Sequence, residues 1–334
     1  MLSQGAEALL ERRIAGESVV IYRKLDGSVV ALEDHCRHRQ APLSLGRKEG
    51  DSIRCMYHGW KFGPDGVCSE IPGQPKVVQK GAAVKAYPVV ERNDLIWVWM
   101  GEGTPPDDSL IPHSVGPSNP EWEMRTSHIK VETNYRQEIA NLTDLSHVAW
   151  VHDQTFGGTA AYSSIRPKYT VTERGLNTEI WARGVPPPAL ARHLFPSDAR
   201  FDLHFDVTFT VPCNFMLAFK VYIAGQATEG PSDGQLLLDT FSSQAVTPRD
   251  AESVDYYYSW GARRGSTAPG LIDLLIEANH EAFLEDKRVL EGQFKRMKEK
   301  PNFKTVDYAH DAGPGKMLFV LDKLIKQEAE QVQA

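Results

Sequence analysis

Two short segments near the start of the chain each pair a cysteine with a histidine, and they constrain the fold more than any other feature. The first, "CRHRQAPLSLG", holds Cys36 and His38, and the second, "CMYHGW", holds Cys55 and His58. Sixteen residues separate His38 from Cys55. Two thiolates and two imidazoles suit a soft or borderline metal centre. We therefore expect a small sheet that brings two loops together around such a centre.

Three interpretations of these pairs compete. In the first, the cysteines are ordinary core residues and the histidines lie on the surface, but the matched pairs and the Gly59 that follows the second pair argue against it. In the second, the set binds structural zinc, yet zinc fingers usually group the two cysteines together and the two histidines together. In the third, the two cysteines hold one iron of a [2Fe–2S] cluster and the two histidines hold the other. Neutral imidazoles raise the reduction potential of such a cluster, and mixed pairs are consistent with this arrangement of ligands.

The composition excludes several classes of protein. The formal net charge of −7 argues against a nucleic-acid binder, which needs a basic surface. No apolar run approaches the 18 or more residues of a membrane span. Glu11, Arg12 and Arg13 stand where a signal peptide would have its apolar core, and four cysteines in 334 residues do not indicate a disulfide framework. We expect a cytoplasmic protein that binds neither nucleic acid nor membrane.

The order of patterns along the chain predicts two domains. Residues 17–101 read as short strands separated by turns, and residues 101–120 are rich in Gly, Pro and Ser and read as a linker. Beyond the linker, helix and strand patterns mix: a helix over 133–150, strands to about residue 262, a long helix from near Pro269 to before Pro301, and a last amphipathic helix. We predict an α+β protein with domains at 1–120 and 121–334.

The segment "NLTDLSHVAWVH", residues 141–152, carries a second candidate metal site. A single histidine on a helix is usually an ordinary core or surface residue, but His147 and His152 stand five residues apart. On an ideal helix that spacing leaves the two rings roughly 140° apart. To meet at one metal, they require a helix that is distorted or that ends there. Two histidines and one carboxylate form the facial triad of non-haem Fe(II) oxygenases, which leaves positions open for O2.

The carboxylate is predicted to come from the long helix. Its segment 281–293 offers Glu281, Glu285 and Asp286. Asp286 shares its helical face with apolar residues, whereas Glu285 lies on a face with other charged residues. A charge on an apolar face needs a partner such as a metal, so Asp286 is the predicted ligand and the two glutamates are the alternatives.

Together these motifs resemble the oxygenase (alpha) subunit of the Rieske non-haem iron oxygenases, in the branch of vanillate O-demethylase, dicamba monooxygenase and the phthalate-type enzymes. The matching patterns are C-x-H and C-x-x-H, N-x-x-D-x-x-H-x-x-x-x-H over 141–152, and E-D-x-x-x-x-E-x-Q over 285–293. Arg37, Gln40 and Met56 depart from residues that are common in the family and bear on the shape of the cluster loops. The resemblance implies an all-β Rieske [2Fe–2S] domain followed by a helix-grip-like catalytic domain, a curved antiparallel sheet with long helices.

The same resemblance implies a function. The protein would be the terminal oxygenase of a multicomponent system that hydroxylates or O- or N-demethylates an aromatic, acidic substrate with O2. Because the chain has no G-x-G-x-x-G motif after a strand, electrons would come from a separate NAD(P)H-dependent reductase or ferredoxin. Head-to-tail electron transfer would require a closed ring, a homotrimer. The alternatives are a cis-dihydroxylating dioxygenase and, in another class, a Rieske electron carrier without oxygenase activity.

Individual roles also follow from the resemblance. Asp144 would bridge a Rieske histidine and an iron-ligand histidine, and Asn141 would lie near the iron without binding it. Tyr222 and Gln244 would face the substrate. Four basic residues near the cluster would form the docking face for the electron donor or remain ordinary surface charges: Arg37, Arg39, Arg47 and Lys61.

Overall fold

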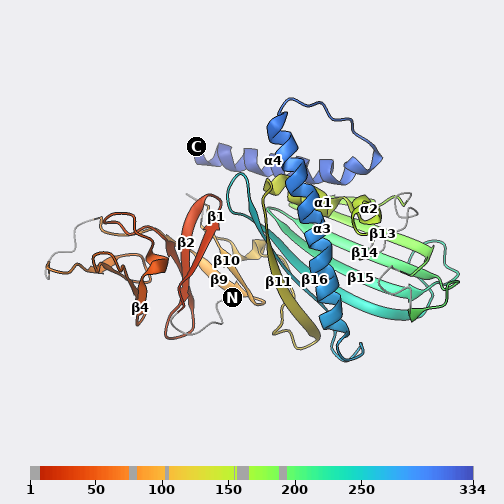
Figure 1. Cartoon of the computed structure of the whole chain (residues 1–334), viewed down its shortest axis with the longest axis horizontal. Helices are drawn as coiled ribbons and strands as arrows, with labels where there is room; N and C mark the ends of the chain where they lie inside the picture. The colour runs from red at the N-terminus through yellow and green to blue at the C-terminus, as the bar shows by residue number, and fades with distance from the viewer. Residues whose placement is uncertain are drawn as a thin grey trace. The chain divides into compact units, whose positions relative to one another are not determined.

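The computed structural model describes residues 8–74, 81–101, 105–153, 155, 165–187 and 194–333 (Figure 1). The chain divides into two compact units, 1–111 together with 248–251, and 112–247 together with 252–334. The division lies inside the segment 101–120 that the sequence marks as a linker. Among the described residues, no helix is long and apolar enough to cross a membrane.

The first unit consists of short antiparallel strands. One sheet has the order β1-β2-β3-β8, formed by Leu10–Ile14, Glu17–Arg23, Val29–Glu33 and Ala86–Tyr87. A second has the order β4-β5-β6-β7, formed by Arg47–Glu49, Ser52–Arg54, Lys61–Phe62 and Cys68–Glu70. β9 (Val89–Arg92) and β10 (Leu95–Val98) form a hairpin. The short 3-10 helices are η1 (Leu43–Leu45) and η2 (Asp108–Leu110).

Strand β2 explains why this unit is stable despite its short elements. Its central residues are all buried, and alternate side chains enter two different clusters: Val20 and Tyr22 pack with the core around the metal loops, and Val19 and Ile21 pack on the other face. Because successive side chains of a strand point to opposite faces, an unbroken apolar run shows that the sheet is covered on both sides. The core on the first face therefore reaches the loops that carry the cysteines, whose side chains belong to it.

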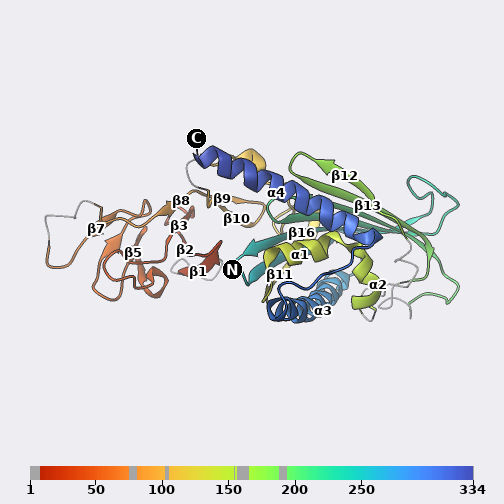
Figure 2. The same ribbon diagram turned by 90° about the horizontal axis from the view of Figure 1, so that it is seen from above.

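The second unit is built on one seven-stranded antiparallel sheet of order β11-β17-β16-β15-β14-β13-β12. The strands, in chain order, are Trp122–Val131, Lys168–Thr172, Gly175–Val185, Phe201–Thr210, Asn214–Ile223, Leu236–Pro248 and Val254–Arg263. The helical elements are α1 (Tyr135–Thr143), η3 (Leu145–His147), α2 (Val148–Val151), α3 (Leu271–Glu299), η6 (Ala309–Asp311) and α4 (Ala312–Gln333). Helix α3 packs on β11 and β17, while α4 packs on α1, β12 and β13 (Figure 2).

The long helix and the interrupted helix both follow from local sequence. α3 begins after Gly270, which has φ +81°, and ends before Pro301, as the sequence predicts. The single helix predicted over 133–150 is wrong: α1 ends at Thr143, Asp144 is extended, and the chain then forms η3 and α2. The Asp144 side chain accepts a hydrogen bond from the Ser146 N–H, as an N-cap does, so the new helical segment starts in a different direction.

Candidate metal centres

The two Cys/His loops of the first unit are built in the same way. The N–H of Cys36 donates to the Ala41 carbonyl at 2.8 Å, and the N–H of Cys55 donates to the Trp60 carbonyl at 2.8 Å. Gly59 has φ +74°, and a Cβ at this position would lie 2.8 Å from Cγ of Pro72, so only glycine fits directly after His58. Both loops are thus closed by main-chain hydrogen bonds around their cysteines.

The four side chains are sorted by burial. Cys36 and Cys55 are each 2% exposed, whereas His38 and His58 are exposed with ring centroids 4.4 Å apart. The pKa of Cys36 is raised to about 11, mainly because burial disfavours the thiolate and further because Cys55 is adjacent. A bound metal displaces thiol protons. Buried thiols below and exposed imidazoles at the tip fit a cluster in which the two cysteines hold one iron and the two histidines hold the other.

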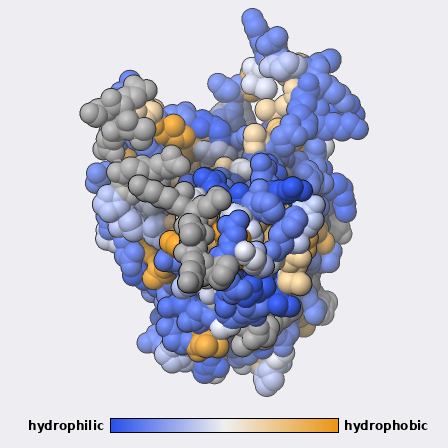
Figure 3. Space-filling model, turned by 90° about the vertical axis from the view of Figure 1, so that its left-hand side faces the viewer, coloured by the Kyte–Doolittle hydropathy of each residue, from blue (hydrophilic) through white to orange (hydrophobic). Residues whose placement is uncertain are grey.

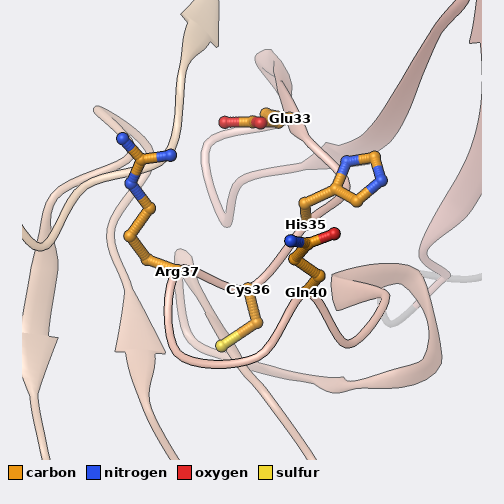
Figure 4. Close-up of a pocket in the computed structure, with 5 residues that line it drawn as sticks. All are labelled: Glu33, His35, Cys36, Arg37 and Gln40. Atoms are coloured by element: carbon orange, nitrogen blue, oxygen red, sulfur yellow. The ribbon is translucent and has the colours of Figure 1, made fainter.

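A hollow beside the first loop contains two of the departures from the family pattern. It has a volume of about 440 Å³ and is lined by Glu33, His35, Cys36, Arg37 and Gln40 (Figure 4). Gln40 has φ +56°, in the left-handed region that costs a non-glycine residue roughly 1–2 kcal/mol. Glycine adopts this backbone conformation without that cost.

The four basic residues near the cluster differ in their surroundings. The Arg47 and Lys61 side chains both face the Glu49 carboxylate, at 2.8 and 3.5 Å. Arg37 and Arg39 are exposed at the tip of the first loop. Figure 3 shows a mainly hydrophilic face interrupted by small apolar patches. Arg37 and Arg39 are therefore better candidates for a positively charged docking face than Arg47 and Lys61, whose charges face the Glu49 carboxylate.

The second unit brings His147, His152 and Asp286 together. The imidazole Nε2 of His147 lies 3.4 Å from Asp286 Oδ1, and Nε2 of His152 lies 3.2 Å from Asp286 Oδ2. One ligand atom from each residue lies within 4.8 Å of the others. The side chains are 17%, 3% and 5% exposed, respectively. Two imidazoles and one carboxylate at this separation match the donor set of a mononuclear non-haem iron site.

Neighbouring groups fix the orientation of both imidazoles. Nδ1 of His147 donates to the main-chain carbonyl of Asp144, and Nδ1 of His152 donates to Glu285 Oε2 at 2.9 Å. Each Nε2 is therefore left with its lone pair toward the centre. Burial acts to lower the pKa of His152, but its hydrogen bonds to Asp286 and Glu285 outweigh burial and raise that pKa.

Glu285 is an alternative metal ligand in the sequence, but in the structure it supports His152. It accepts from His152 and, at 2.8 Å, from the Thr155 hydroxyl. We predict that Glu285→Ala lowers the affinity of the mononuclear site for Fe(II) by roughly 10–100-fold, the usual cost of losing a partner of a ligating histidine. The measurement is a competition titration with a chelator. The exposed Glu281, on the same helix, provides the control Glu281→Ala, and equal affinities in the two variants would contradict this role.

Asp144 contacts His147, but not in the way that the resemblance implies. The bond from His147 goes to the Asp144 main-chain carbonyl, and the carboxylate accepts from the Ser146 N–H at 2.9 Å. Within this chain the Asp144 carboxylate is not the acceptor for His147, and the role of Asp144 as a bridge stays a prediction. Asn141 lies near the ligand set as expected, since its Nδ2 donates to Asp286 Oδ1 at 3.2 Å.

The two residues expected to face substrate lie on opposite faces of the sheet. Gln244 pairs with Phe215 and accepts a hydrogen bond from the Tyr256 hydroxyl at 2.6 Å, and Tyr256 packs against Phe283 of α3. Tyr222 has the opposite parity in β15 and packs near Trp181 on the other face, with ring centroids 5.9 Å apart. Gln244 therefore shares the face that α3 covers, and the prediction that Tyr222 lines the same site is wrong.

Comparison with known proteins agrees with this pair of centres. Residues 2–88 match the Rieske [2Fe–2S] domain, and residues 131–327 match the vanillate O-demethylase oxygenase C-terminal domain. The chain is 33% identical over 340 residues to the toluene-4-sulfonate monooxygenase system iron–sulfur subunit of Comamonas testosteroni, which covers 97% of this chain and 93% of that relative. It is 30% identical over 343 residues to the vanillate O-demethylase oxygenase subunit of a Pseudomonas species, with 98% and 93% covered.

Among solved structures, dicamba monooxygenase bound to dicamba superposes with a TM-score of 0.87 at 26% identity, covering 99% of this chain and 96% of that one. A Rieske domain joined to a sheet-and-helix catalytic domain defines the oxygenase component of a Rieske non-haem iron oxygenase. Within that class, the chain belongs to the family of the vanillate O-demethylase oxygenase subunits. The predictions of fold, enzyme class, [2Fe–2S] cluster and mononuclear iron are confirmed.

Proposed function

We propose that this oxygenase hydroxylates or O- or N-demethylates a small aromatic substrate, and that it receives electrons from a separate NAD(P)H-dependent reductase or ferredoxin. The observation that carries the proposal is the convergence of His147, His152 and Asp286 in a chain that also has a Rieske domain. Relatives named as a vanillate O-demethylase oxygenase subunit, a dicamba O-demethylase oxygenase component and a chloroacetanilide N-alkylformylase oxygenase component support this type of reaction. The cytoplasmic location stays a prediction from the sequence.

We assign the cluster to Cys36, His38, Cys55 and His58, and the mononuclear iron to His147, His152 and Asp286. Iron at the second site supplies the activation of O2. The chain contributes the orientation of the ligands: the Asp144 carbonyl and Glu285 hold the two imidazoles, and Asn141 holds Asp286. The Asp144 carbonyl and Glu285 bond the Nδ1 atoms of the two imidazoles and so leave each Nε2 available for the metal. Three protein ligands would leave coordination positions open for O2 and for nearby substrate.

The substrate is proposed to bind on the face of the sheet that α3 covers. Gln244 lies on this face, where its amide donates to Ser242 and accepts from Tyr256. Among the described residues, the helix-facing positions of β13–β17 carry no charged side chain. An apolar wall with a few neutral polar groups suits an aromatic ring. The acidic group of the substrate that the resemblance implies would find no cationic side chain at these helix-facing positions.

We further propose a homotrimeric ring in which the Rieske centre of one subunit serves the mononuclear iron of the next. A heterologous contact of this type forms a finite assembly only if the ring closes. Asp144 is the proposed bridge. Among the described residues, its half-buried carboxylate has one hydrogen-bond partner, the Ser146 N–H, which leaves acceptor capacity for an imidazole N–H of the neighbouring subunit.

The proposal is tested first by metal analysis of anaerobically purified protein. We expect about three irons and two acid-labile sulfides per chain, the sum of one [2Fe–2S] cluster and one mononuclear site. About two irons and two sulfides, unchanged by added Fe(II), would indicate an electron carrier and would refute the role of His147, His152 and Asp286. Zinc without sulfide would refute both iron assignments.

A further inference from the structure

A buried carboxyl group lies behind the mononuclear site. Glu138 of α1 is 2% exposed, and its Oε2 has no hydrogen-bond partner among the described residues. Its pKa is raised to about 8, first because burial disfavours the carboxylate and second because of the charge of Asp286. An ionised carboxylate without a partner is costly in such a place. The Glu138 carboxyl group is therefore mainly protonated at neutral pH, so its O–H can donate a hydrogen bond to a nearby acceptor.

An acceptor without a donor lies on the same face of the same helix. Asn141 follows Glu138 by three residues, a spacing at which helical side chains are neighbours. Asn141 Nδ2 donates to Asp286 Oδ1, and because a carboxylate can only accept, the amide nitrogen must be the atom on that side. The amide oxygen Oδ1 then points away from Asp286, and it is buried without a hydrogen-bond partner among the described residues.

We propose that Glu138 is a positioning residue that keeps its proton and donates a hydrogen bond from its carboxyl group to Asn141 Oδ1. The resulting chain runs from Glu138 to Asn141 and from Asn141 to Asp286. It satisfies both buried atoms with one bond and fixes the amide in the orientation that holds Asp286 toward the two histidines. No proton is transferred: it stays on Glu138 while Asn141 donates its own N–H.

The charges around Glu138 favour the neutral form. From α3, Asp286 and Glu291 disfavour ionisation, and Lys287 favours it. The Lys287 ammonium, however, is bound to Glu291 at 2.7 Å and to the Lys130 carbonyl. From β17, Tyr256 is close enough for Glu138 to raise the pKa of its phenol. The Lys287 ammonium is thus already paired with the Glu291 carboxylate, and burial remains the main influence on the pKa of Glu138.

The first test is the pH dependence of stability, measured as the thermal unfolding midpoint of protein that retains its Rieske cluster after chelation of the mononuclear iron. Because the pKa of Glu138 is higher in the folded than in the unfolded protein, its proton stabilises the fold at low pH, and this contribution is lost as the pH rises from the ordinary glutamate range through about 8. Glu138→Gln keeps an N–H donor and cannot ionise, so its midpoint should not show this loss. Parallel pH profiles for wild type and Glu138→Gln would overturn the proposal.

The second test is Co(II) binding to the same chelated protein, followed by optical titration. Glu138→Leu should weaken binding by roughly 10-fold or more, as for other groups that orient a metal ligand, while Glu138→Gln should stay close to wild type. In an Asn141→Leu background, the advantage of Gln over Leu at residue 138 should disappear, because the donor has no acceptor. The proposed hydrogen bonds would be refuted if Glu138→Leu bound Co(II) as tightly as the wild type. They would also be refuted if Gln kept its advantage over Leu at residue 138 in the Asn141→Leu background. Neither test uses substrate, so both are independent of the proposed reaction.

Discussion

Asp286→Ala is expected to remove the mononuclear iron and to leave the Rieske cluster intact. The Asp286 carboxylate presents one oxygen to each histidine. Among the described residues, it is the only carboxylate in the group of three side chains whose ligand atoms lie close enough together to share a metal. Losing a ligand should cost more than the roughly 10–100-fold that losing a ligand's partner costs. Iron should therefore fall from about three to about two per chain, with sulfide and the visible absorption of the cluster unchanged, and substrate-dependent O2 consumption should stop.

The matched control for this variant is Glu281→Ala, which removes an exposed carboxylate from the same helix. It should keep its iron and its activity. Full activity in Asp286→Ala would instead move the metal ligand to another carboxylate, and Glu285, which already contacts His152, would be the first to examine. Loss of sulfide in Asp286→Ala would show a general failure to fold, and a comparison of circular dichroism with the control would identify it.

The position of Asp286 was predictable because it depends only on helical periodicity. An acidic residue among apolar neighbours on one helix must be buried wherever that face packs, and Asp286 is buried in the structure. The end of the helical segment at His152 was equally predictable in kind, since two histidines five residues apart cannot meet on an unbroken helix. The sequence did not reveal the additional break at Asp144, where α1 ends and the 3-10 helix η3 begins.

The contacts that hold the ligands were not predictable, because they join elements far apart in the sequence. Glu285 contacts His152 across 133 residues, and Asn141 contacts Asp286 across 145. Helical periodicity places Glu285 on a charged face and therefore suggests a solvated side chain. A charged face can, however, meet a histidine from another helix. The only signal in the sequence for a role of Glu285 was its position directly before Asp286, as in the family motif E-D-x-x-x-x-E-x-Q.

The error at Tyr222 has a simple physical origin. Side chains of a strand alternate between faces, so an offset of one residue moves a side chain to the opposite side of the sheet. Within β15 the alternation is regular, and Tyr222 has the opposite parity to Phe215, the residue that pairs with Gln244. Tyr222 therefore lies on the other face from Gln244.

The second large effect is expected at Asp144. In the proposed ring, its carboxylate accepts a hydrogen bond from a Rieske histidine of the neighbouring subunit, while its main-chain carbonyl accepts from His147. Asp144→Asn keeps a side-chain oxygen to cap Ser146, since asparagine and aspartate are comparable N-caps. The local fold and the His147 contact should therefore survive, and only the charge is lost. A hydrogen bond to a charged group is worth about 1.5–3 kcal/mol, so the expected slowing of electron transfer is about 10–100-fold.

The measurement that isolates this step is stopped-flow reoxidation of the prereduced cluster after mixing with O2 and substrate. Asp144→Asn should keep about three irons per chain, reduce normally with dithionite, and reoxidise slowly. Asp144→Ala provides the comparison, because it also removes the cap, at a cost of about 1 kcal/mol, and should lower stability as well as rate. An unchanged rate in Asp144→Asn would remove the carboxylate from the electron path. The route would then pass through the Asp144 main-chain carbonyl, whose contact with His147 neither substitution alters.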